Sequence, residues 1–175
     1  KLPFLRITMN TFLIAATVTA FKTVTSLFAA YSFVYYDFRG KGILYFIMLA
    51  TMFIPFTVTM IPNYLMISKI GLSDKIWGVA LPQLADVLGR PSIISTGIIF
   101  FINSWNEYVW PVLILKSKEN YTLSLALQMY ISAEGGTEFT IAMAVSVMTM
   151  VIPLALYILF QRYIINTFAM SGIKG

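Results

Sequence analysis

The sequence contains no cysteine and no histidine, and charged residues make up only 11% of its 175 positions. The absence of these two residue types excludes disulfides, thiolate nucleophiles, zinc sites with His or Cys ligands, and acid–base mechanisms that depend on imidazole. A soluble domain carries roughly 25% charged residues, and a fold of this size cannot hide so much apolar surface from water. With 59% hydrophobic residues and a mean hydropathy of +0.83, the chain is expected to lie in a lipid bilayer.

Basic residues outnumber acidic ones, 12 against 7, which gives a formal net charge of +5 and an isoelectric point near 9.5. No two Lys or Arg residues are adjacent, whereas nucleic-acid-binding proteins cluster them on one face. We interpret the basic residues as anchors at the membrane–water interface. We therefore expect the lipid bilayer, and no nucleic acid, among the partners of the chain.

Five apolar stretches are predicted to form helices, at about 9–36, 43–68, 76–88, 91–115 and 139–165. Crossing the ~30 Å hydrocarbon core takes about 20 apolar residues. The stretch at 76–88 covers only roughly 20 Å and is too short to cross. The segment 116–138 is too polar to span and predicts a loop with a short amphipathic segment at about 123–130. The predicted fold class is an all-α polytopic transmembrane helical bundle with about five spans, one of them truncated.

Gly89-Arg90-Pro91 follows the short stretch and leaves no room for a loop before the next predicted span. Either the short stretch is re-entrant, or residues are missing between Leu88 and Pro91. The basic residues of the polar turns divide almost evenly between the two sides of the membrane, whereas a complete polytopic protein shows a bias. This balance gives no orientation in the membrane and favours a missing charged segment at about 89–90. We predict that residues 1–175 form a single transmembrane domain.

Several short motifs follow one another along nearly the whole chain. In the first half they are Phe38, Gly40 and Lys41; Ile54-Pro55, Ile61-Pro62 and Tyr64; Gly71-Leu72-Ser73-Asp74; and Leu81-Pro82. In the second half they are Ser104-Trp105-Asn106-Glu107, Tyr121-Thr122-Leu123, Gln161-Arg162-Tyr163 and Gly172-Ile173-Lys174-Gly175. This ordered set resembles the inner-membrane permease subunit of bacterial carbohydrate-type ABC importers, the maltose-transporter-like family.

The resemblance implies a multi-pass protein of the bacterial cytoplasmic membrane with the ABC importer permease fold and six spans. It implies import of a sugar or sugar-like solute, an oligosaccharide or glycerol phosphate, by alternating access. The partners would be a second, homologous permease subunit, an ATPase dimer and an extracytoplasmic solute-binding protein that docks on the loop 121–138. ATP and Mg²⁺ would be bound by the ATPase, so that this chain would hold no cofactor and would not itself be an enzyme.

One motif of the resembled family is missing. Its cytoplasmic coupling loop, E-A-A-x-x-D-G-A, is expected between the span that opens on Leu81-Pro82 and the span with Trp105-Asn106-Glu107, but no such string occurs. The interruption falls at Gly89-Arg90, directly after the apolar stretch that is too short to cross the membrane. We expect that the end of one span and the coupling loop are absent from this sequence. A complete protein without that loop would lose its main contact with the ATPase.

Polar residues interrupt the apolar stretch at 91–115. On a continuous helix, Asn103, Asn106, Glu107 and Trp110 share one face. A carboxylate inside a span costs several kcal/mol unless it faces a cavity or a partner, and amides beside an indole suit the hydroxyls and C–H face of a sugar. We predict that this face lines the substrate pathway; the alternative is ordinary hydrogen bonding between helices.

Lys22 is the second ionisable residue predicted inside the membrane. Lys22 and Glu107 would each be an unmatched charge alone, so we predict that they form an intramembrane charge pair. The alternative is that Lys22 reaches polar water at the interface or in a cavity.

Three prolines lie within predicted spans: Pro55 and Pro62 about two turns apart, and Pro153 in the last stretch. Each removes a backbone donor and bends its helix. Thr59 and Asn63, beside the first two, are predicted to line the pathway together with exposed carbonyls. The alternative is a kink that serves packing alone.

The chain contains no G-x-x-x-x-G-K-[ST] phosphate-binding loop, so energy for transport would come from a partner. Through the resemblance, Ser171, Gly172, Lys174 and Gly175 are candidate contacts of the C-terminal tail with the ATPase; the alternative is a solvated tail. Two other functions stay open from the sequence. The chain could be an ion-coupled secondary transporter that uses Lys22 and Glu107, or a structural membrane subunit without a pathway of its own.

Overall fold

The computed structural model describes residues 3–51, 53–84, 93–131 and 139–172, which form helices and turns with no β-strand among them. The elements are α1 (Phe4–Tyr35), α2 (Lys41–Thr51), α3 (Phe56–Lys69), α4 (Ile76–Leu84), α5 (Ile93–Asn106), α6 (Val109–Ile114), the 3₁₀ helix η1 (Lys118–Asn120), α7 (Leu123–Ile131) and α8 (Phe139–Gly172). The all-α fold class predicted from the sequence is confirmed for the described residues.

Helices α1 and α8 are the longest, with 32 and 34 residues. At 1.5 Å per residue each is about 50 Å long, and each contains a window apolar enough to cross a membrane. Both helices leave most large apolar side chains outside the packing of this chain, including Phe28 and Leu159. Apolar side chains on the outer surface are what a helix surrounded by lipid requires, so α1 and α8 are candidate bilayer-spanning helices.

The predicted span at 43–68 is broken into α2 and α3, which meet at an angle of 95°. Pro55 lies directly before α3, in an extended conformation with φ −62° and ψ 141°, because a proline cannot continue the hydrogen-bond ladder of a preceding helix. Counted as one bent span, this pair brings the candidates in the described part of the chain to three. The five-span count therefore stays a prediction.

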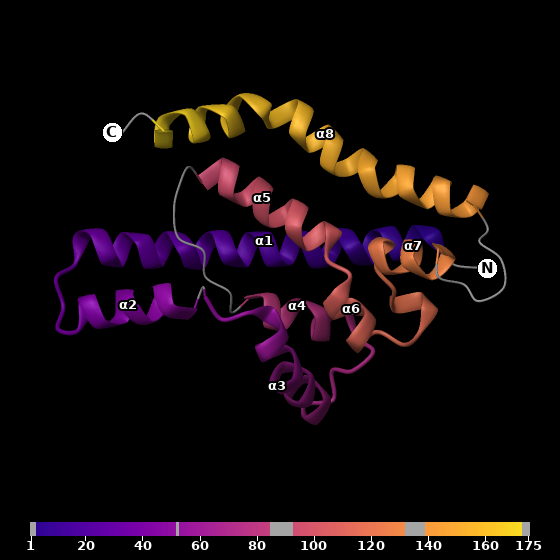
Figure 1. The fold of residues 1–175 in the computed structure, drawn as a ribbon, viewed down its shortest axis with the longest axis horizontal. Coiled ribbons are helices and arrows are strands. Elements are labelled where there is room, and N and C mark those ends of the chain that lie inside the picture. Colours follow the sequence, from indigo (N-terminus) through magenta and orange to yellow (C-terminus); the bar gives the residue numbers. More distant parts are fainter. Residues whose placement is uncertain (1–2, 52, 85–92, 132–138, 173–175) are drawn as a thin grey trace.

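Helix α5 lies between α1 and α8, and α4 and α6 lie on the other side of α1 (Figure 1). The core is built where these helices and α7 meet. Its fully buried side chains include Ile7, Ala15 and Val18 of α1, Val79 and Ala80 of α4, Trp105 of α5, Trp110 and Ile114 of α6, Leu123 and Leu125 of α7, and Val145 of α8. The amphipathic segment predicted at 123–130 is α7, whose buried face packs against α8 and α1.

The beginning of α1 is attached to the segment that leads into α7. The Asn10 side chain donates hydrogen bonds to the carbonyls of Glu119, at 2.8 Å, and Tyr121, at 3.3 Å. The Thr11 hydroxyl accepts a hydrogen bond of 2.8 Å from the backbone N–H of Leu123, the first residue of α7. Because both side chains are buried, these bonds satisfy polar groups that would otherwise be costly in the core.

Candidate functional site: a cavity in the helical bundle

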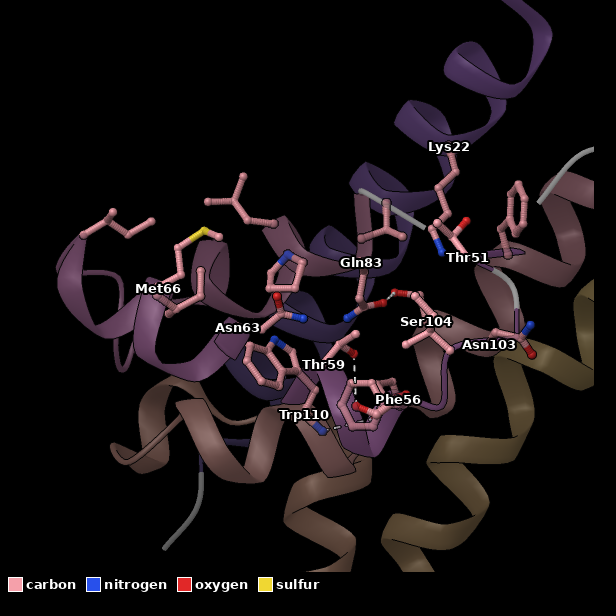
Figure 2. A pocket seen from close by; sticks show the side chains of 18 of the residues that line it. Lys22, Thr51, Phe56, Thr59, Asn63, Met66, Gln83, Asn103, Ser104 and Trp110 are labelled. Carbon is pink, nitrogen blue, oxygen red and sulfur yellow. Dashed lines mark hydrogen bonds between the residues drawn. The ribbon is translucent and has the colours of Figure 1, made fainter. Parts of the chain in front are cut away.

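A cavity of about 760 Å³ lies between the first six helices. Small-molecule sites are typically about 300–1,000 Å³, so its size is that of a ligand site. The residues that line it are Val18 and Lys22 of α1; Met48 and Thr51 of α2; Ile54; Phe56, Thr59, Asn63, Met66 and Ile67 of α3; Ile70; Leu81, Pro82 and Gln83 of α4; Phe100, Asn103 and Ser104 of α5; Glu107; and Trp110 of α6. Figure 2 shows how side chains from distant parts of the chain gather around this space.

The lining combines hydrogen-bonding groups with aromatic rings. Hydroxyl and amide groups come from Thr51, Thr59, Asn63, Gln83, Asn103 and Ser104, and rings come from Phe56, Phe100 and Trp110. The rings of Phe56 and Trp110 meet edge to face, with centroids 6.2 Å apart. Such a surface offers both directional hydrogen bonds and a flat apolar platform to a ligand.

The predicted continuous helix at 91–115 is wrong. Helix α5 ends at Asn106 and α6 begins at Val109, with Glu107 and Tyr108 between them. The cause is Pro111: it has no N–H to donate to the carbonyl of Glu107, and its ring would collide with that carbonyl in a continuous helix. In the first turn of the short α6, Pro111 is tolerated.

The break changes which predicted residues share a surface. Asn103, Glu107 and Trp110 line the cavity, together with Thr59 and Asn63, whereas Asn106 does not line it and is exposed. The Glu107 side chain accepts a hydrogen bond of 3.2 Å from the backbone N–H of Trp110 and so satisfies a free donor at the start of α6. Thr59 donates to the carbonyl of Phe56 in its own helix, at 3.0 Å.

Gln83 and Ser104 are cavity residues that the sequence reasoning missed. The Ser104 hydroxyl donates a 3.0 Å hydrogen bond to Oε1 of Gln83, which joins α5 to α4 (Figure 2). Both could have been predicted from the sequence, because they are polar residues inside apolar stretches, and such residues face a bundle interior or a cavity.

Lys22 is buried, and its Nζ lies 5.3 Å from the centroid of the Phe100 ring, within the range of a cation–π contact. Lys22 and Glu107 both line the cavity. Among the residues that the structure describes, no ion pair joins these two; the ion pairs found are Arg6–Glu119 and Lys41–Asp37. The predicted charge pair between Lys22 and Glu107 stays a prediction.

The three predicted kink positions lie at different places in their helices. Pro55 precedes α3, Pro62 lies inside α3, and Pro153 lies inside α8. A further proline, Pro82, lies inside α4 and lines the cavity.

Of the predicted tail contacts, Ser171 and Gly172 are the last residues of α8, and Lys174 and Gly175 lie outside the described residues. Gly89-Arg90-Pro91 also lies outside them. Within the described segments, no three Asp or Glu residues come close enough to hold a metal ion.

The cavity thus lies in a bundle of apolar helices, in which α1, a candidate membrane span, forms part of the cavity lining. The arabinooligosaccharides transport system permease protein AraQ of Halalkalibacterium halodurans is 26% identical over 204 residues, covering 95% of this chain and 73% of that protein. AraQ of Bacillus subtilis is 27% identical, covering 89% and 70%. The sn-glycerol-3-phosphate transport system permease protein UgpE of Pectobacterium atrosepticum is 24% identical, covering 94% and 72%. No family model matches the chain.

The chain is thus similar to these transport-system permease proteins over most of its length, which supports a membrane permease subunit of an ABC importer in the bacterial inner membrane. The alignment with AraQ of Halalkalibacterium halodurans runs over 204 residues, although this chain has only 175. That relative therefore contains residues within the aligned stretch that have no counterpart here. The missing segment expected at about 89–90 stays a prediction.

Proposed function

We propose that the cavity is this chain's part of a translocation pathway for a sugar or sugar-like solute, an oligosaccharide or glycerol phosphate. The observation that carries the proposal is the meeting of Asn63, Gln83 and Asn103 with the rings of Phe56 and Trp110 around one cavity. Sugar hydroxyls take directional hydrogen bonds from amides, and the C–H face of a sugar packs on aromatic rings. The relatives AraQ and UgpE are permease proteins of transport systems for arabinooligosaccharides and sn-glycerol-3-phosphate, which supports the same class of solute.

The chain would work as a single transmembrane domain over residues 1–175, paired with a second, homologous permease subunit. An ATPase dimer would bind ATP and Mg²⁺ and hydrolyse the nucleotide, so this subunit would not itself be an enzyme or hold a cofactor. A solute-binding protein would deliver the solute from outside. Closure of the ATPase dimer would shift the permease pair between inward-facing and outward-facing states, which is a population shift between two arrangements of packed helices.

Asn103 and Asn106 provide a matched pair of variants for the test. They lie one turn apart at the end of α5, but only Asn103 lines the cavity. In membrane vesicles that contain the complete transporter, we expect Asn103→Leu to lower ATP-dependent solute uptake about tenfold, the effect of one lost hydrogen bond of roughly 1.4 kcal/mol. Asn106→Leu should leave uptake within about twofold of the unaltered chain.

Copurification of the ATPase with each variant controls for assembly. Equal uptake by the two variants would contradict the assignment of the cavity as the pathway. Uptake that persists without ATP but stops when the proton gradient is dissipated would contradict the importer mechanism.

A further inference from the structure

Two helices, α4 at the cavity and α8 behind α5, each contain a proline that leaves a backbone carbonyl without its helical donor. In an α-helix, the N–H of each residue donates to the carbonyl four residues earlier. Pro153 of α8 therefore leaves the carbonyl of Thr149 unsatisfied, and Pro82 of α4 leaves the carbonyl of Gly78 unsatisfied.

Both of these carbonyls accept a hydrogen bond from a tryptophan. The indole Nε1–H of Trp105 donates to the carbonyl of Thr149 at 3.0 Å, and that of Trp110 donates to the carbonyl of Gly78 at 3.1 Å. Both side chains are almost completely buried, with 0% and 1% of their surface exposed. In each helix, the indole thus donates to the carbonyl that the proline has left without its helical donor.

We propose that Trp105 and Trp110 are positioning residues that fasten the proline-interrupted helices α8 and α4 to the two sides of the break between α5 and α6. Glu107 lies in this break, and Ser104 lies one residue before Trp105; both line the cavity. The orientation of this cavity wall is therefore set jointly by α4, through Trp110, and by α8, through Trp105. The proposal rests on the proposed function in that the wall it concerns belongs to the translocation pathway.

Each indole is itself held by further contacts. Trp105 stacks on Phe101, with ring centroids 5.7 Å apart, and its carbonyl accepts a 3.1 Å hydrogen bond from the Ser124 hydroxyl of α7. Trp110 packs edge to face against Phe56, and its backbone N–H donates to Glu107. Proline inside a membrane helix is tolerated where a neighbouring helix satisfies the released carbonyl. Here the donors come from two residues that flank one break.

The pairing of each tryptophan with one proline makes a crossed rescue experiment possible. Trp105→Phe removes the donor to Thr149, and Pro153→Ala restores an N–H in α8 that can replace it. In the purified complete transporter in lipid, we expect Trp105→Phe to increase the unfolded-to-folded ratio of the chain about tenfold. Pro153→Ala should remove most of this increase, and Pro82→Ala should not.

The converse is expected for the second pair. The loss of stability caused by Trp110→Phe should be rescued by Pro82→Ala and not by Pro153→Ala. Pro62→Ala in α3 is the matched control, and it should rescue neither variant. The proposal would be overturned if a proline substitution rescued the other tryptophan variant. It would also be overturned if the effects of the tryptophan and proline substitutions on the free energy of unfolding simply added.

Uptake measurements separate the positioning role from simple stability. Trp105 is not among the described residues that line the cavity, so Trp105→Phe should lower the maximal uptake rate at least about threefold and leave the half-saturating solute concentration unchanged. A raised half-saturating concentration with an unchanged maximal rate would overturn the proposal. If the unaltered transporter takes up no sugar or glycerol phosphate, the proposed function fails, while the unfolding experiment still decides the pairing of indoles and carbonyls.

Discussion

Asp74 accepts two hydrogen bonds from Ser117 on its two carboxylate oxygens. The backbone N–H of Ser117 donates to Oδ1 at 2.8 Å, and the Ser117 hydroxyl donates to Oδ2. The backbone N–H of Lys116 also donates to Oδ1, at 2.7 Å, and the Asn120 side chain donates to the carbonyl of Asp74, at 2.6 Å. The turn after α3 is thus fastened to the segment after α6, around an aspartate whose φ of 58° lies in the left-handed region.

This cluster makes the stability of the chain depend on pH. Partial burial raises the pKa of Asp74, but the hydrogen bonds from Ser117, Lys116 and Asn120 outweigh burial and lower this pKa from 3.8 to about 2. Because the folded-state pKa lies below the unfolded value, the stabilisation is fully present above about pH 4 and is lost as the pH falls towards about 2.

The corresponding variant is Asp74→Asn, which tolerates the left-handed conformation and removes the charge. We expect it to lower the free energy of unfolding at neutral pH by about 1–2 kcal/mol, and this difference from the unaltered chain should shrink as the pH falls towards about 2. Thermal unfolding at a series of pH values measures it. Asp37→Asn is the control, because Asp37 is fully exposed and its ion pair among the described residues is with Lys41, at the start of α2. A difference independent of pH would contradict the prediction.

Gly78 is expected to be intolerant of any side chain. A Cβ at this position would lie 2.3 Å from the carbonyl oxygen of Leu72 and 3.1 Å from side-chain atoms of Ile67 and Ile114. Since a backbone oxygen cannot move aside easily, Gly78→Ala should lower the free energy of unfolding by about 1–3 kcal/mol.

Gly42, in α2, is the matched control for Gly78. A Cβ there would have no atom within 4 Å, so Gly42→Ala should be neutral or stabilise by up to about 1 kcal/mol through helix propensity. Thermal unfolding of the two variants side by side is the measurement. Equal effects would show that the close approach of α4 to Leu72 does not matter for stability.

Lys22 is expected to distinguish charged from neutral solutes, because its ammonium group lines the cavity. Lys22→Met should lower the uptake of sn-glycerol-3-phosphate about tenfold, through loss of attraction to the phosphate. The uptake of an arabinooligosaccharide should change less than about threefold, since it carries no charge for Lys22 to attract.

The ratio of the two initial uptake rates in the same vesicles removes differences in expression. Lys22→Arg keeps the positive charge and should largely preserve this ratio. An equal decrease for both solutes would contradict the predicted role in selecting an anion and would indicate a structural role for Lys22.

The long helices were predictable from the sequence because membrane spans depend on local properties. Apolar length alone located α1 and α8, and the amphipathic character of residues 123–130 located α7. The grouping of polar residues was predictable in part: Asn63, Glu107 and Trp110, which were predicted to line the substrate pathway, all lie around the cavity. These residues are polar or amphipathic groups inside apolar stretches, a signal that does not require knowledge of the tertiary structure. That the cavity is the pathway stays a prediction.

The remaining features depend on contacts between distant segments. The break after Asn106 has a local cause in Pro111, which the prediction of a continuous helix overlooked. The hydrogen bond from Trp105 to Thr149 joins residues 44 positions apart, and no periodicity in the sequence encodes which indole meets which carbonyl. That pairing follows only once the helices are packed.

Helix α2 supplies Met48 and Thr51 to the cavity, yet none of its eleven residues is buried within the chain. A segment with few buried contacts opens at a lower free energy than the core to which it is attached. The cavity therefore has one loosely held wall, formed by α2, whereas α1 and α5, which also line it, pack closely against each other. We therefore expect the position of this wall to depend on what contacts the outer face of α2, lipid or a neighbouring subunit, as well as on this chain's own core.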